Sequence, residues 1–253
     1  MRILIKLNAL EYSAFDRKYH HKMQGFIYSL LKDTRYSELH NKKGYKFFCF
    51  SNLFPIGSTK KGDIKQFLIS SPNKDLIKVL KEKLTSLTQV RIGSINFKIN
   101  SITKLEPKIS KKVRLITGTP IIIRIPKQNY SKYNIKPNNY EYIYWKPKYL
   151  FNAFIKQLED NLFKKYNDFY NTTIKDFPIF EHFIFKKDVC NHIILHKKEV
   201  KVFGSNWEFI FDYLDKESRK LLQFGLETGF GEFNSLGFGF INIRSRSTPI
   251  EMS

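Results

Sequence analysis

The 253-residue sequence is poor in the residues that build disulfide scaffolds and membrane spans. It contains two cysteines, Cys49 and Cys190, too few for a disulfide framework and typical of a reducing compartment. No stretch approaches the roughly 18 apolar residues that a membrane span requires, and the first apolar run is too short for a signal peptide. These absences predict a soluble cytoplasmic protein with no membrane partner.

Acidic residues are also scarce. The 23 Asp and Glu face 44 Lys and Arg, which leaves a net charge of +21. This excess is larger than solubility requires, so a polyanion, and nucleic acid first, is the expected partner. An adenine-thymine-rich coding sequence would also enrich lysine, so many of the lysines are expected to be ordinary solvated surface.

A metal site is not expected. His20 and His21 are neighbours about 100° apart on a predicted helix, which is poor geometry for chelating one ion together. Cys190 and His192 lie in a strand-like run, and the chain has no second Cys/His pair at zinc-site spacing. The sequence therefore predicts no metal and no cofactor.

Hydrophobic periodicity divides the chain into two similar halves. Ile3, Ile5 and Leu7 alternate as in a strand, and a helical stripe runs from Tyr19 to Leu30. In the first half we expect strands at residues 2–7, 45–50, 64–70 and 95–99, with helices at 19–32 and from Ser71-Pro72 onward. In the second half we expect strands within 113–125, 177–185, 193–203, 207–211 and 238–243, with helices at 147–166 and from Asp215 to Gly225.

Between the halves, residues 106–112 lose the apolar pattern, which predicts a boundary there. Each half then reads as a βαββαβ unit. The fold class predicted is α+β, with tandem ferredoxin-like (βαββαβ, RRM-like) domains at residues 1–110 and 111–253 and a C-terminal glycine-rich loop.

That loop carries two Gly-x-Gly pairs, Gly229/Gly231 and Gly237/Gly239. Glycine allows positive φ and close approach of the backbone to a ligand. A dinucleotide fingerprint would need a strand before the glycines and a helix after them, and a phosphate-binding P-loop would end in Gly-Lys-Ser/Thr. Neither condition is met, because this loop joins a helix to a strand.

Residues 229–239, Gly-Phe-Gly-Glu-Phe-Asn-Ser-Leu-Gly-Phe-Gly, resemble the C-terminal glycine-rich loop of the CRISPR-associated endoribonucleases that cut precursor CRISPR RNA, within the repeat-associated (RAMP) superfamily. The resemblance implies a partner, CRISPR repeat RNA. It also implies that Gly229, Gly231, Gly237 and Gly239 bind RNA.

The first helix and the segment after it are similar to the active-site region of that family. There a tyrosine, a histidine and a lysine form a metal-free ribonuclease site, and the matching positions here are Tyr28, His40 and Lys46. Lys42 and Lys43, beside them, are expected to bind RNA and are alternatives to Lys46. His21, on the polar face of the same helix as Tyr28, is the reserve candidate for proton transfer.

The chemistry that the resemblance implies suits these residue types. The 2′-hydroxyl of RNA can attack the adjacent phosphate, so the protein must supply proton transfer and charge stabilisation, which histidine and lysine provide. We therefore expect a metal-independent transesterification that leaves a 2′,3′-cyclic phosphate and a 5′-hydroxyl. The alternatives are a non-catalytic RNA-binding subunit of the same superfamily and a general basic RNA chaperone. Membership of a CRISPR effector complex and formation of a homodimer stay open.

Overall fold

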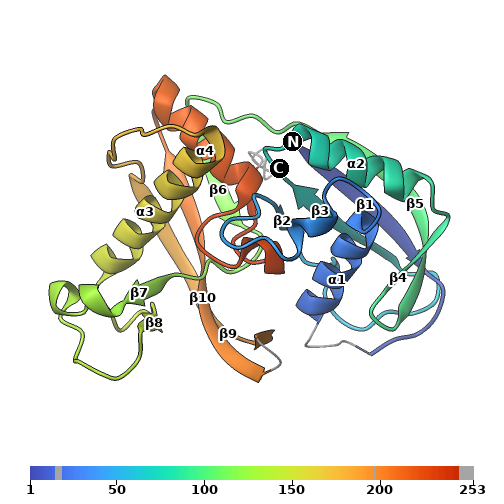
Figure 1. Ribbon diagram of the computed structural model, residues 1–253, viewed down its shortest axis with the longest axis horizontal. Helices are drawn as coiled ribbons and strands as arrows, with labels where there is room; N and C mark the ends of the chain where they lie inside the picture. Colours follow the sequence, from blue (N-terminus) through green and yellow to red (C-terminus); the bar gives the residue numbers. More distant parts are fainter. Residues whose placement is uncertain (15–18, 196–197, 245–253) are drawn as a thin grey trace, which may run out of the picture.

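The computed structural model describes residues 1–14, 19–195 and 198–244. They form two α+β units side by side, and in each unit two helices cover one face of an antiparallel sheet (Figure 1). Residues 106–112 connect the last strand of the first sheet to the first strand of the second. No described helix is long and apolar enough to cross a membrane.

The first unit has five strands and two helices. Its sheet order is β2-β3-β1-β5-β4. The elements are β1 (Arg2–Ala9), α1 (Tyr19–Leu31), β2 (Cys49–Phe50), β3 (Ile64–Ser70), α2 (Lys74–Thr85), β4 (Gln89–Ile92) and β5 (Ile95–Leu105). The alternation read from β1 holds, because Ile3, Ile5 and Leu7 are all fully buried. They face Met23 and other apolar side chains of α1 in one core.

Two expectations for this unit are wrong in detail. The strand expected at 45–50 is reduced to β2, because Phe47 adopts a positive φ of 50° that breaks an extended chain. Helix α2 begins at Lys74 and not at Pro72. Asn73 is its N-cap, since the Asn73 side chain accepts a hydrogen bond from the backbone N–H of Leu76, whereas the Ser71 hydroxyl donates to the Phe47 carbonyl.

The second unit repeats the arrangement with insertions. Its four-stranded sheet has the order β11-β6-β10-β9, and β7 pairs with β8 separately. The elements are β6 (Val113–Thr117), β7 (Arg124–Pro126), β8 (Tyr142–Tyr144), α3 (Phe151–Tyr170), β9 (His182–Leu195), β10 (Lys198–Phe211), α4 (Lys216–Thr228) and β11 (Ile241–Ile243). Short 3₁₀ helices occupy Ser37–Leu39, Lys127–Asn129, Ser131–Tyr133 and Asn234–Leu236.

The strand orders of the two sheets match. In each unit the last strand pairs with the first, giving β5-β1-β3-β2 in one and β11-β6-β10-β9 in the other. This is the order of a βαββαβ fold, so the tandem ferredoxin-like prediction is confirmed. The strands expected at 177–185, 193–203 and 207–211 have the wrong bounds, because residues 182–195 form one strand, β9, and residues 198–211 form another, β10, which pairs with β9 along its length.

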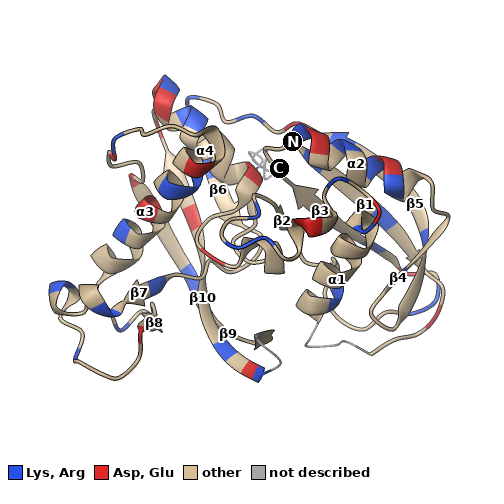
Figure 2. Cartoon of the chain, in the orientation of Figure 1, with Lys and Arg blue, Asp and Glu red and all other residues tan. Residues whose placement is uncertain are grey.

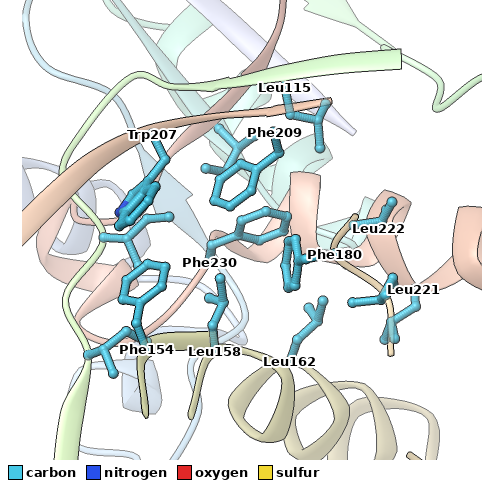
Figure 3. Close-up of a cluster of buried hydrophobic side chains, with 14 of the residues drawn as sticks. Leu115, Phe154, Leu158, Leu162, Phe180, Trp207, Phe209, Leu221, Leu222 and Phe230 are labelled. Carbon is cyan, nitrogen blue, oxygen red and sulfur yellow. The ribbon is translucent and has the colours of Figure 1, made fainter. Parts of the chain in front are cut away.

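The core of the second unit is aromatic. Figure 3 shows Phe154, Leu158 and Leu162 of α3 facing Trp207 and Phe209 of β10. The ring of Phe230, from the glycine-rich loop, lies among these side chains, with its centroid 5.6 Å from that of Phe209. The loop is therefore anchored in the core at its first turn.

Helix α4 begins as expected, with Asp215 capping the N–H of Ser218, but it does not stop at Gly225. Gly225 lies inside the helix, which continues to Thr228. A Cβ built at Gly225 would lie 2.4 Å from the ring of Phe230, so the glycine is explained by close packing and not by a helix end.

Arg2 of β1 ties the two units together. Its guanidinium donates to the carbonyls of Leu226 and Ile241 and lies over the ring of Phe240, 4.5 Å from the centroid. The N-terminal ammonium also pairs with Glu227 at 2.5 Å. A buried cation bonded to both α4 and β11 fixes the glycine-rich segment between them against the first sheet.

Lysine and arginine are spread over both units (Figure 2).

Candidate functional site

The glycine-rich loop fills residues 229–240, between α4 and β11. Gly229, Gly231, Gly237 and Gly239 all have positive φ, between 66° and 87°, and all are buried. A Cβ at Gly239 would lie 1.9 Å from the Phe230 carbonyl oxygen, and one at Gly237 would lie 2.5 Å from the Phe50 ring. The glycines are thus required by the packing of the loop, and residues 232–235 are the part that reaches the surface.

A buried lysine, Lys165, hydrogen-bonds to this loop. The ammonium of Lys165, on α3, donates to the carbonyls of Gly229 and Gly231 at 2.6 and 3.2 Å and to the side-chain oxygen of Asn234 at 3.0 Å. Burial lowers the pKa of Lys165 to about 7. Sequence reasoning missed this residue. The available signal was that Lys165 continues the buried stripe of α3, seven positions after Leu158.

The surface part of the loop rests on helix α1. The Gln24 amide donates to the Ser235 carbonyl at 2.9 Å, and His20 Nδ1 lies 3.0 Å from the Leu236 carbonyl. The ring of His20 also stacks on Phe238, with centroids 4.5 Å apart. Burial lowers the pKa of His20 to about 4, so its ring is neutral near pH 7, and Nδ1 must carry the proton to bond a carbonyl.

The three predicted catalytic residues meet beside this contact. The rings of Tyr28 and His40 lie edge to face with centroids 4.7 Å apart. The Lys46 ammonium lies 5.3 Å from the centroid of the Tyr28 ring and donates to the His40 carbonyl. Tyr28 comes from α1, His40 from the end of the 3₁₀ helix Ser37–Leu39, and Lys46 from the chain that leads to β2. Three residues that lie up to 18 positions apart in the sequence therefore form one cluster.

The three side chains differ in their surroundings. His40 is exposed, whereas Lys46 is half-buried and its pKa is lowered by that burial. Burial raises the pKa of Tyr28 to about 12, an effect that the nearby Ser235 side chain partly opposes. The Tyr28 hydroxyl is buried and has no hydrogen bond of normal geometry within the described residues. The Tyr28 hydroxyl is therefore neutral near pH 7 and can hydrogen-bond to a ligand.

The other predicted site residues lie close to this cluster or are engaged elsewhere. Lys42 and Lys43 are exposed, and the ammonium of Lys42 lies 5.1 Å from the centroid of the Phe47 ring. His21 Nε2 accepts a hydrogen bond of 2.6 Å from the backbone N–H of Ile194 in β9, and burial lowers its pKa. His21 is thus committed to a contact between the two units.

A cleft of about 530 Å³ opens between this cluster and helix α3. Lys46 and Ser235 lie on its wall, so it is continuous with the Tyr28 cluster. Within residues 1–14, 19–195 and 198–244, no three His, Cys, Asp or Glu side chains gather as a metal site would need. The lining is partly aromatic and carries both basic side chains, such as Lys46 and Lys164, and carboxylates, such as Glu141 and Asp160. The exposed imidazole of His40 and the ammonium of Lys46 beside it can exchange protons with a bound polyanion and pair with its charge.

Comparison with known proteins identifies the family of this chain. A family model described as CRISPR associated protein Cas6, C-terminal, matches residues 102–243. A curated Methanocaldococcus jannaschii protein named CRISPR-associated endoribonuclease Cas6 2 is 36% identical over 253 residues, covering 96% of this chain and 99% of its own. The chain belongs to the Cas6 family. The family resemblance carried by residues 229–239 is thereby confirmed.

Other Cas6 proteins extend the comparison. A Haloferax mediterranei protein named CRISPR-associated endoribonuclease Cas6 is 25% identical over 99% of this chain and 96% of its own. A solved structure of a Cas6-related protein from Pyrococcus furiosus superposes with a TM-score of 0.73 at 22% identity, covering 98% of this chain and 99% of the other. A further solved Cas6 structure superposes with a TM-score of 0.71 at 24% identity, covering 97% and 99%. The two structural matches cover 97% and 98% of this chain, so the shared fold includes both units.

Proposed function

We propose that this Cas6 protein is an endoribonuclease that binds CRISPR repeat RNA and cuts precursor CRISPR RNA by transesterification. The observation that carries the proposal is the meeting of Tyr28, His40 and Lys46 beside the glycine-rich loop. Full-length relatives named as Cas6 endoribonucleases support the same activity.

The reaction uses the substrate's own nucleophile. The 2′-oxygen of one nucleotide attacks the adjacent phosphorus, and the bond from phosphorus to the 5′-oxygen of the next nucleotide breaks. A general base takes the proton of the 2′-hydroxyl and a general acid gives one to the departing 5′-oxygen, so the reaction consumes no net proton, and His40 makes one of these two transfers. The products are a 2′,3′-cyclic phosphate and a 5′-hydroxyl.

Each residue of the cluster has one part in this scheme. His40 is exposed at the mouth of the site and transfers protons, a function that typically contributes about 10² to 10⁴-fold in rate. The ammonium of Lys46 stabilises the negative charge that develops on the phosphate. Tyr28 stays neutral because its pKa is raised, so its unpartnered hydroxyl orients the 2′-hydroxyl and does not serve as the base.

RNA binding is assigned to the surfaces around the cluster. Residues 232–235 of the glycine-rich loop reach the surface beside Tyr28, and the four buried glycines give that segment its shape. Lys42 and Lys43 supply phosphate contacts on the other side. A solved structure described as an RAMP protein binding different RNA substrates superposes with a TM-score of 0.70 at 20% identity, which supports RNA as the ligand of this fold.

The test uses repeat RNA in which the nucleotide before the scissile phosphate carries a single 2′-deoxy substitution. We expect one defined cut in the unmodified RNA, also in excess EDTA, and no cut in the deoxy RNA at nearly unchanged affinity. Normal cleavage of the deoxy RNA would show that water is the nucleophile. Binding without any cut of either RNA would identify a non-catalytic RNA-binding subunit.

Two further partners are proposed separately, a CRISPR effector complex and a second copy of this chain. A Cas6 protein that keeps its product after cleavage would hand it to a CRISPR effector complex, and two copies could share one RNA as a homodimer. Size-exclusion chromatography with light scattering, with and without repeat RNA, measures the second. A mass of one chain per RNA would rule out the homodimer.

A further inference from the structure

One face of helix α3 lines the cleft beside the candidate active site. The residues concerned are Gln157, Asp160, Asn161, Lys164 and Lys165, spaced as one helical face requires. The opposite walls come from residues 44–48, from Arg124 and Tyr142, and from residues 231–235. The volume of about 530 Å³ is within the usual range for pockets that enclose small organic ligands.

Asn161 is the unusual residue of this face. Its side-chain oxygen is buried and has no hydrogen-bond partner among the described residues. An unpaired buried amide oxygen costs stability, and asparagine is also a poor residue for a helix interior. Folding alone would favour alanine or leucine at this position. A ligand that donates to Asn161 would explain the amide.

A second buried polar atom belongs to the candidate catalytic cluster. The Tyr28 hydroxyl has no hydrogen bond of normal geometry in the described part of the chain. Lys46 connects the two places, because it lines the cleft and also lies over the Tyr28 ring. The cleft therefore begins where the scissile phosphate would lie and leads away from it along α3.

The chemistry of the cleft suits one nucleotide. Tyr45 and Tyr142 present aromatic rings, and the Arg124 guanidinium lies 4.6 Å from the centroid of the Tyr142 ring. Arg124 also pairs with Glu232, so its charge is matched within the protein. Lys164 is exposed at the rim. Aromatic faces, side-chain amides and nearby cations are the groups that recognise unstacked bases in RNA.

We propose that this cleft is a subsite for a single unstacked nucleotide next to the scissile phosphate, whose base donates a hydrogen bond to Asn161. The proposal rests on the function proposed above and adds a determinant of sequence preference to it. Holding this base would also fix the sugar-phosphate backbone at Lys46, which places the 2′-oxygen in line with the bond that breaks.

The first arm of the test leaves the protein unchanged. Repeat RNAs carry an abasic site either just before or just after the scissile phosphate, and kcat/KM and Kd are measured for each. One of the two abasic RNAs is expected to lose about tenfold or more in kcat/KM or in Kd, the effect of one base contact with its stacking. Equal values for both abasic RNAs and the intact RNA would overturn the proposal.

The second arm assigns the contact to Asn161. Asn161→Ala is expected to keep or raise Tm, and to lower cleavage or binding of intact RNA by a similar factor. The sensitive abasic RNA should show no further loss with this variant, since contact partners are not additive. Asn152→Ala, an exposed asparagine of the same helix, is the matched control and should behave as wild type. A lowered Tm, or losses that multiply, would contradict the assignment.

The two proposals can fail separately. If the protein cuts intact repeat RNA but ignores both abasic sites, the subsite is wrong and the endoribonuclease proposal stands. If the protein binds repeat RNA without cutting it, the Kd values of the abasic RNAs and of Asn161→Ala still decide the subsite.

Discussion

The ring of Tyr28 lies edge to face against the ring of His40, with an angle of 86° between their planes. This contact brings together Tyr28 of helix α1 and His40 of the segment after it. The Lys46 ammonium lies 5.3 Å from the centroid of the same Tyr28 ring. Because the Tyr28 ring also packs edge-on to Phe48, the ring and the hydroxyl have separable roles.

Tyr28→Phe should separate those roles. The ring contacts with His40 and Phe48 are retained, and the lost hydroxyl had no hydrogen bond among the described residues, so Tm should not fall. The single-turnover cleavage rate should drop by about 10²-fold, the cost of a poorly oriented nucleophile, with Kd unchanged. A variant that binds RNA more weakly but cuts bound RNA at the normal rate would assign Tyr28 to binding.

Lys46→Ala should lower both rate and affinity. The variant loses the charge that stabilises the transition state and one phosphate contact. Lys43→Ala is the matched control, an exposed lysine in the same segment whose loss should weaken binding slightly and leave the rate of bound RNA unchanged. Single-turnover kinetics at saturating protein, with Kd from titration, distinguish the two. Equal rate losses in both variants would show that Lys46 is not the residue that stabilises the negative charge on the phosphate.

Gly237→Ala should destabilise the protein through a clash between its two units. Gly237 and Gly44 have similar φ values of 86° and 82°, but only a Cβ at Gly237 would meet the Phe50 ring, at 2.5 Å. Gly44→Ala should therefore cost about 1 kcal/mol in backbone strain. Gly237→Ala should cost roughly 1–3 kcal/mol more from overpacking. Urea denaturation measures both, and equal losses would show that Phe50 yields freely.

Lys165 should give the stability of the protein a pH dependence. Its folded-state pKa of about 7 lies below its usual value of 10.5, so between these values the unfolded chain binds more protons than the folded one. The free energy of unfolding contributed by Lys165 therefore rises with pH across this window and reaches its maximum above pH 10.5. Relative to Lys165→Met, the wild type should gain roughly 1 kcal/mol or more between pH 7 and pH 9 in urea denaturation. A constant difference would mean that the ammonium stays charged in the folded state.

Local patterns predicted much of the fold. The alternation of Ile3, Ile5 and Leu7 and the stripe of α1 follow from burial of one face, which periodicity reports directly. Other predictions failed where two neighbouring residues could fill the same structural position. Ser71 and Asn73 can both cap a helix, and only the distant bond of Ser71 to Phe47 decides between them.

The site shows the same division. Tyr28, His40 and Lys46 were predicted from a segment of similar sequence, and their separation along the chain is short enough for one loop to gather them. Lys165 could not be predicted in this way, because its three acceptors lie 64 to 69 residues further along the chain. The unpaired oxygen of Asn161 depends likewise on which groups surround it in space.

The most direct test of the whole account is the single-turnover cleavage rate of repeat RNA by His40→Ala, with Kd measured in parallel. If His40 transfers protons at the scissile phosphate, the rate should fall by about 10² to 10⁴-fold. Kd should hardly change, because affinity comes mainly from many phosphate contacts. His21→Ala is the control, since His21 is bonded to Ile194, and it should cut at the wild-type rate. A wild-type rate for His40→Ala would contradict the account.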